Sequence, residues 1–146
     1  MIGRLDELNQ LERFYNSSKF EFLTMYGRRR IGKTTILREF AGRHKALFFS
    51  AQEKNDSLNL LDFSKMVQTF FEGSFISSFQ NWEAAFEYIT GKISDKKLVL
   101  IIDEFPFLAE PNPSIKSILQ HTIDHVWKGK NIFLILCGSS VSFMLN

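Results

Sequence analysis

The chain has very little cysteine, and Cys137 is the only one among its 146 residues. A single thiol excludes an internal disulfide framework and fits a reducing compartment. The chain also has no apolar run near the roughly 20 residues that a helix needs to cross a bilayer. Its opening stretch, MIGRLDELNQ, lacks the apolar core of a secretory signal peptide. These absences predict a cytoplasmic protein without a membrane segment.

Charge of one sign is not in excess either, since 18 Lys and Arg stand against 16 Asp and Glu. Nucleic-acid-binding domains usually carry dominant, clustered basic charge. The net charge of +2 therefore gives no support to a nucleic-acid partner. Apolar residues, by contrast, make up 45% of the chain, with sixteen Phe among them. The length suits one domain with one core, predicted to span residues 1–146.

Short apolar runs alternate with segments of helical periodicity. The predicted strands are 21–26, 46–50, 98–102 and 131–137. The predicted helices are 4–16, 33–43, 58–71, a segment from the Asn81 cap to Gly91, and 114–127. Strands alternating with helices imply a parallel sheet with right-handed crossovers, so the predicted fold class is α/β with three layers.

Two further groups of residues are interpreted as packing. Cys137 ends a predicted strand, and the sequence shows no His and Asn arrangement that would make it a catalytic nucleophile. The Phe groups 48/49, 70/71 and 105/107 are assigned to the core, where most large apolar side chains lie. An exposed Phe among them would indicate a contact with a further domain.

A glycine-bounded loop, GRRRIGKT at residues 27–34, follows the first predicted strand and matches G-x-x-x-x-G-K-[ST]. Glycines let backbone N–H groups converge on phosphate oxygens, and the next helix points its positive end at the same anion. In this pattern Lys33 reaches the β- and γ-phosphates, the Thr34 hydroxyl binds Mg²⁺, and Thr35 adds an α-phosphate contact. The predicted nucleotide-binding residues here are Gly27, Arg28, Arg29, Arg30, Ile31, Gly32, Lys33, Thr34 and Thr35.

The alternative for this segment is a glycine turn in a basic surface loop. The predicted strand before it and helix after it favour the phosphate-binding loop. Arg28, Arg29 and Arg30 occupy its variable positions. They either add positive potential for the nucleotide or are solvated side chains without a specific contact, and both interpretations stay open.

Polar side chains follow the third and fourth predicted strands, where ligands bind in an open α/β sheet. Asp103 suits a carboxylate that holds Mg²⁺ through water, and Glu104 suits the base that orients and polarises the attacking water. Ser139 or Ser140 would contact that water or the γ-phosphate. The alternative for Asp103 and Glu104 is a pair that caps the next segment, and the alternative for the serine is an ordinary helix N-cap.

GRRRIGKT, LIIDEFPFL and LILCGSS, in this order, resemble the archaeal-type ATPase family in the AAA+/STAND branch of P-loop NTPases. The opening IGRLDELNQLERFY is similar to that family's G-R-x-x-E-L-x-x-L stretch, which covers the adenine. The resemblance implies that Gly3 and Arg4 lie near the base and that Asp103 and Glu104 form the Walker B pair. Ser139 or Ser140 would then be the sensor-1 residue.

The same resemblance implies ATP as the nucleotide, and no guanine-reading N-K-x-D motif is present. It also implies a sheet of order 5-1-4-3-2, of which strands 1-4-3-2 are expected here. Family members tend to have Tyr where this chain has Phe107, which keeps the ring and loses the hydroxyl.

The sequence ends at GSSVSFMLN, before the family's fifth strand, helical lid, sensor-2 arginine and arginine finger. We therefore expect a domain that is incomplete at its C-terminus. A missing lid, a C-terminal domain or another subunit would complete its site. Because an arginine that meets the developing charge accelerates phosphoryl transfer by orders of magnitude, hydrolysis by this segment is expected to be slow.

The first functional interpretation is an ATP-binding P-loop ATPase that hydrolyses ATP with Mg²⁺, with weak activity in isolation. The second is a nucleotide-operated switch or scaffold, against which Glu104 argues, because a pure switch needs no water-activating carboxylate. The third is a DNA-processing protein, suggested only by the nuclease-like C-terminal half that family members usually have.

Overall fold

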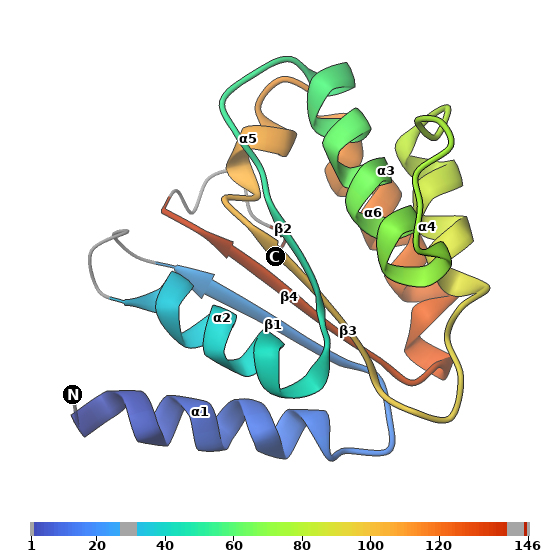
Figure 1. Ribbon diagram of the computed structural model, residues 1–146. Helices are drawn as coiled ribbons and strands as arrows, with labels where there is room; N and C mark the ends of the chain where they lie inside the picture. Colours follow the sequence, from blue (N-terminus) through green and yellow to red (C-terminus); the bar gives the residue numbers. More distant parts are fainter. Residues whose placement is uncertain (1, 27–31, 140–144, 146) are drawn as a thin grey trace.

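The computed structural model describes residues 2–26, 32–139 and 145, and their side chains from residue 6 onward. Helices cover both faces of a single sheet (Figure 1). The elements in chain order are α1 (Ile2–Tyr15), β1 (Glu21–Tyr26), α2 (Lys33–His44), β2 (Leu47–Ser50), α3 (Asp56–Glu72), α4 (Trp82–Thr90), β3 (Leu98–Asp103), α5 (Pro106–Ala109), α6 (Ser114–His125), the 3₁₀ turn η2 (Trp127–Gly129) and β4 (Ile132–Gly138).

The four strands form one parallel sheet in the order β1-β4-β3-β2. All seven residues of β4 are buried, as expected for a central strand covered on both faces. In the register, Tyr26 lies beside Gly138 and Ser50 beside Asp103. The carboxyl ends of the strands therefore share one edge of the sheet. The predicted α/β class, three-layer architecture and strand order are confirmed.

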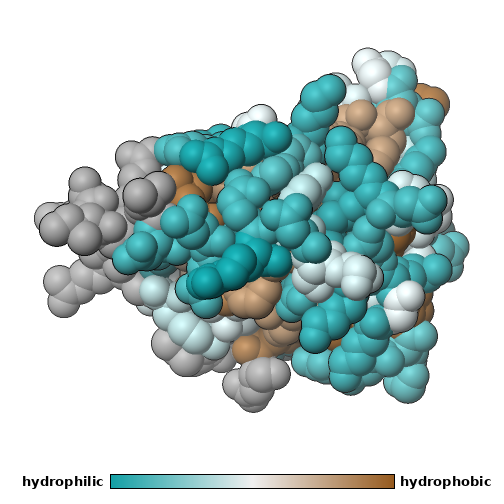
Figure 2. Space-filling model, turned by 90° about the horizontal axis from the view of Figure 1, so that it is seen from below, coloured by the Kyte–Doolittle hydropathy of each residue, from teal (hydrophilic) through white to brown (hydrophobic). Residues whose placement is uncertain are grey.

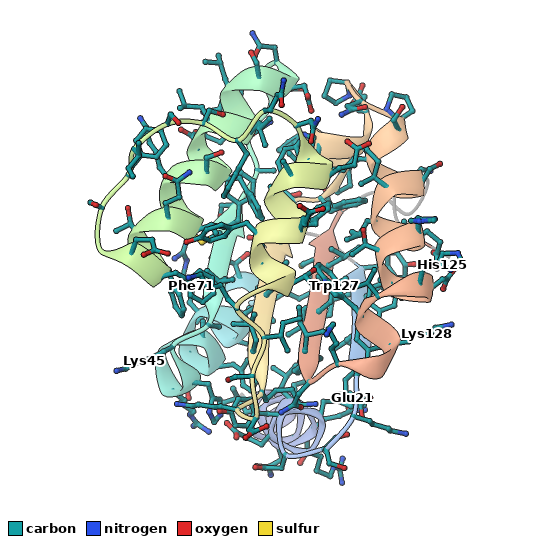
Figure 3. The ribbon with its side chains drawn as sticks, turned by 90° about the vertical axis from the view of Figure 1, so that its right-hand side faces the viewer. Glu21, Lys45, Phe71, His125, Trp127 and Lys128 are labelled. Atoms are coloured by element: carbon teal, nitrogen blue, oxygen red, sulfur yellow. The ribbon has the colours of Figure 1, made fainter. Side chains whose placement is uncertain are left out.

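Two apolar clusters fill the space on either side of the sheet. One packs α1 and α2 against the sheet through residues such as Leu11, Phe40 and Phe133. The larger one packs α3, α4 and α6 on the opposite face, around residues such as Phe63 and Trp127. Figure 3 views the molecule from the side of this second layer, and Figure 2 shows a largely hydrophilic surface from below.

The clearest differences from the sequence-based expectation are two helix boundaries and one additional helix. Helix α3 begins at Asp56, because the Asn55 side chain accepts a hydrogen bond from the Leu58 N–H (2.9 Å). Helix α6 ends at His125, and Trp127 lies instead in η2, where its indole N–H donates to Thr90 Oγ1 (2.8 Å). The short helix α5 was not expected at all.

The assignment of the Phe groups to the core is wrong for one member. Phe49 and Phe105 are buried, but Phe70 on α3 is 41% exposed. Adjacent helical residues point about 100° apart because a turn takes 3.6 residues, so Phe70 and Phe71 do not share a face. Within the described part of the chain, no helix has the length and apolar character needed to cross a membrane.

Candidate active site

Helix α2 begins at Lys33, directly after a glycine in the left-handed conformation. Gly32 has φ 78°, and its carbonyl accepts the first helical hydrogen bond from the Ile36 N–H (3.0 Å). Only glycine takes this conformation without a steric penalty, which explains the second glycine of the loop motif. The first backbone N–H groups of the helix have no intrahelical acceptor, so this end of α2 can receive an anion.

The beginning of α2 is joined to the end of β3 by a side-chain hydrogen bond. Thr34 Oγ1 donates to Asp103 Oδ2 across 3.0 Å, although the two residues are 69 positions apart in sequence. Asp103 is only 5% exposed, and its Oδ1 accepts a hydrogen bond from the Glu104 N–H (3.0 Å). Hydroxyl and carboxylate oxygens are the ligands that Mg²⁺ prefers, so this pair fits that ion.

Mg²⁺ at phosphate sites is usually held by one or two carboxylates together with substrate phosphates and water. Across the described residues, no three His, Cys, Asp or Glu side chains gather to hold a metal by themselves. The pair of Thr34 and Asp103 therefore suits an ion that arrives with a phosphorylated ligand.

Lys33 is the clearest sign of such a ligand. Its side chain is 7% exposed, and its ammonium has no hydrogen-bond partner among the described residues. A buried ammonium without a partner is costly, and an anion relieves that cost. Lys33 and Asp103 both affect the thiol of Cys137. The pKa of this thiol is raised to about 12, mainly by burial; Asp103 adds to the rise and Lys33 opposes it.

The backbone turns sharply after Asp103. Glu104 has φ 57°, a left-handed conformation that costs a non-glycine residue free energy. Two hydrogen bonds hold the turn: the Glu104 N–H donates to its neighbour Asp103, and the Phe105 N–H donates to the Cys137 carbonyl (2.9 Å). Strained backbone of this kind is often found at functional sites.

A cavity of about 490 Å³ opens at this edge of the sheet, within the size range of small-molecule sites. It is lined by Thr34, Ala51, Gln52, Glu53, Asp103, Glu104 and Phe107. A second cavity of about 380 Å³ shares Glu53 and Phe107 with it. Gln52 and Glu53 were not among the predicted site residues, although both follow the second predicted strand at its carboxyl end, where ligands bind.

Four predicted site residues, Lys33, Thr34, Asp103 and Glu104, thus lie at one edge of the sheet. Thr35 is exposed on α2 and Ser139 is exposed after β4, and neither is among the described residues that line the cavity. Gly3 and Arg4 belong to α1, but their side chains lie outside the described residues. The other predicted positions outside the described residues are Gly27, Arg28, Arg29, Arg30, Ile31 and Ser140.

The structure thus combines a parallel sheet of order β1-β4-β3-β2 with a glycine-led helix N-terminus beside the acidic end of β3. Residues 1–146 match the model of an ATPase domain found predominantly in Archaea, and the protein belongs to that family. The resemblance drawn from the sequence motifs is confirmed.

Relatives agree with this assignment, and solved structures agree with the fold. An uncharacterized protein of Methanocaldococcus jannaschii is 33% identical over 143 residues, which cover 98% of this chain and 30% of that protein. An uncharacterized ATP-binding protein of the same organism is 41% identical over 44 residues, covering 30% of this chain and 75% of that protein. The chain thus spans less than a third of the first relative.

Among solved structures, Cdc6p from Pyrobaculum aerophilum matches with a TM-score of 0.64 at 19% identity, over 96% of this chain and 40% of that one. A chain in the structure of Drosophila ORC bound to AT-rich DNA and Cdc6 matches with a TM-score of 0.61 at 17% identity. That match covers 97% of this chain and 47% of the other. At these identities the likeness concerns the fold alone.

Proposed function

We propose that this chain binds ATP with Mg²⁺ and hydrolyses it between the β- and γ-phosphates, slowly as a single domain spanning residues 1–146. The observation that carries the proposal is the buried ammonium of Lys33, which has no hydrogen-bond partner among the described residues and lies at the same edge of the sheet as the hydrogen-bonded Thr34 and Asp103. Membership of an ATPase-domain family supports the same activity.

In this proposal Lys33 and the first N–H groups of α2 bind the phosphates, joined by residues 27–31 and Thr35. Thr34 and Asp103 are the residues that would hold Mg²⁺. The bound ion would neutralise charge that develops on the phosphate oxygens. Gly3 and Arg4 are proposed to lie near the adenine, and Ser139 or Ser140 near the γ-phosphate.

Glu104 is the proposed base. It lines the cavity, and its backbone is held by two hydrogen bonds: its own N–H donates to Asp103, and the N–H of the next residue, Phe105, donates to the Cys137 carbonyl. A carboxylate in this place orients the attacking water and accepts its proton. Because Asp103 is fixed by Thr34 and by the Glu104 N–H, the two acids have separate tasks: Asp103 holds the ion and Glu104 activates the water.

The proposed site also needs parts from elsewhere. The match covers only 30% of the first relative, and an arginine from a lid, a C-terminal domain or another subunit would stabilise the transition state. Nucleic acid is left out of the proposal because the net charge is only +2. We place the protein in the cytoplasm, since its single cysteine is a buried free thiol suited to a reducing compartment.

The proposal is tested by measuring Mg²⁺-dependent ATP binding and single-turnover hydrolysis for the wild type and Glu104→Gln. Loss of the base is expected to slow hydrolysis by about 100-fold or more and to leave ATP affinity unchanged. Glu87→Gln removes the same charge at an exposed position on α4 and serves as the control. Absence of ATP binding would refute the proposal, and equal hydrolysis rates would favour the nucleotide-operated switch.

A further inference from the structure

The loop between β2 and α3, residues 51–55, lies directly beside the turn formed by Asp103 and Glu104, called the acidic turn below. The Ala51 N–H donates to the Asp103 carbonyl (3.0 Å), which extends the pairing of β2 with β3 one residue beyond the strand. The next residue, Gln52, lines the same cavity as Thr34 and Glu104. The backbone pairing thus brings a glutamine to the part of the site where the proposed metal-binding and water-activating residues meet.

Gln52 is held in place by a buried asparagine. Asn59 on α3 is 0% exposed, and its side-chain amide makes two reciprocal hydrogen bonds with the Gln52 backbone. Nδ2 donates to the Gln52 carbonyl (2.9 Å), and Oδ1 accepts from the Gln52 N–H (3.1 Å). A fully buried amide is costly unless it is hydrogen-bonded, and here both of these bonds go to one loop residue. The loop backbone at Gln52 is therefore tied to α3.

The Gln52 carboxamide itself makes no hydrogen bond within the described residues, and the side chain is exposed at the cavity. A carboxamide has one acceptor oxygen and two donor hydrogens. It can accept a hydrogen bond from water and donate one to a phosphate oxygen at the same time. Glu53 also lines this cavity, but its carboxylate would repel a triphosphate, so Gln52 is the better contact residue.

We propose that Gln52 contacts the γ-phosphate and the attacking water, and that Asn59 is the positioning residue that holds Gln52 there. This inference rests on the proposed ATP hydrolysis. The water oxygen bonds to the γ-phosphorus while the bond from that phosphorus to the β–γ bridging oxygen breaks. The electron pair of the broken bond stays on ADP, and the water proton passes to Glu104. Gln52 transfers no proton and only orients the reactants.

The test compares the wild type with Gln52→Ala, Asn59→Leu and the double variant. Affinities for ADP and for a nonhydrolysable ATP analogue are measured with Mg²⁺, together with the single-turnover rate. Loss of a hydrogen bond to a charged group corresponds to about 10- to 100-fold, so Gln52→Ala is expected to slow hydrolysis by about that factor. Its affinity for ADP is expected to match the wild type. Gln80→Ala, the same change in an exposed loop outside the cavity, is the control.

Asn59→Leu is expected to reproduce the rate loss with ADP affinity retained, and the double variant is expected to be no slower than either single one. Because only the folded protein binds ADP, a variant that fails to fold is recognised by its loss of ADP affinity. Lys33→Ala separates the two proposals. If Lys33→Ala loses nucleotide while Gln52→Ala hydrolyses like the wild type, the Gln52 inference is overturned alone. Additive rate losses would overturn the role of Asn59, and nucleotide binding unaffected by Lys33→Ala would overturn the proposed function.

Discussion

Replacing Glu104 by glycine and, separately, by alanine isolates the backbone of the acidic turn from its chemistry. Both substitutions remove the carboxylate, so a difference in stability between the two variants reports the backbone preference of the residue at position 104, where φ is 57°. A left-handed conformation costs a residue with a Cβ about 1–2 kcal/mol. Glycine loses more conformational entropy on folding, which favours alanine by about 0.4–1 kcal/mol. The difference predicts that Glu104→Gly is more stable than Glu104→Ala by about 0.5–1 kcal/mol.

The assay is urea unfolding without nucleotide. All variants are fitted with the same m value, the slope of the free energy of unfolding against urea concentration. Glu110 provides a matched control, because it is also a glutamate but has φ −64° and ψ −54°, a right-handed conformation. There the order is expected to reverse, with Glu110→Ala more stable than Glu110→Gly. If Glu104→Ala proves as stable as Glu104→Gly, the turn is not left-handed in solution, and the account of how Glu104 reaches the cavity fails.

Two further predictions concern stability and thiol chemistry. Asn55→Ala removes the cap of α3 and is expected to lower the free energy of unfolding by about 1 kcal/mol, measured by urea denaturation; no change would contradict the cap. The Cys137 thiol is expected to resist alkylation in the folded protein at pH 8 and to react once the protein is unfolded. Burial raises its pKa to about 12, so at pH 8 the reactive thiolate is scarce. Rapid alkylation of the native protein would show that the thiol is not buried beside Asp103.

The sheet and its two-sided covering follow from patterns that local sequence carries well. The all-apolar runs 98–102 and 131–137 predict strands covered on both faces, and they are the two central strands β3 and β4. The loop motif and the acid after the third strand are expected at one edge because parallel strands end together. The hydrogen bond between Thr34 and Asp103 agrees with that expectation.

Features that depend on tertiary contacts could not be predicted in the same way. Helix α5 has only four residues, too few for a helical period, and Pro106 at its first turn resembles a break in the sequence. Trp127 continues the apolar pattern of α6, but it is placed in η2 with its indole bonded to Thr90. Gln52 belongs to no periodic pattern, and its place is set by Asn59, seven residues further along the chain.

The most direct test of the account is equilibrium binding of ATP in the presence of Mg²⁺ by the wild type and Lys33→Ala. Lys130→Ala, which removes an exposed ammonium far from this edge of the sheet, is the control. If the buried Lys33 ammonium is the partner of the phosphates, its removal weakens ATP affinity by about 10- to 100-fold, and the control binds like the wild type. Equal affinity of all three proteins for ATP, or no binding by the wild type, would contradict the account.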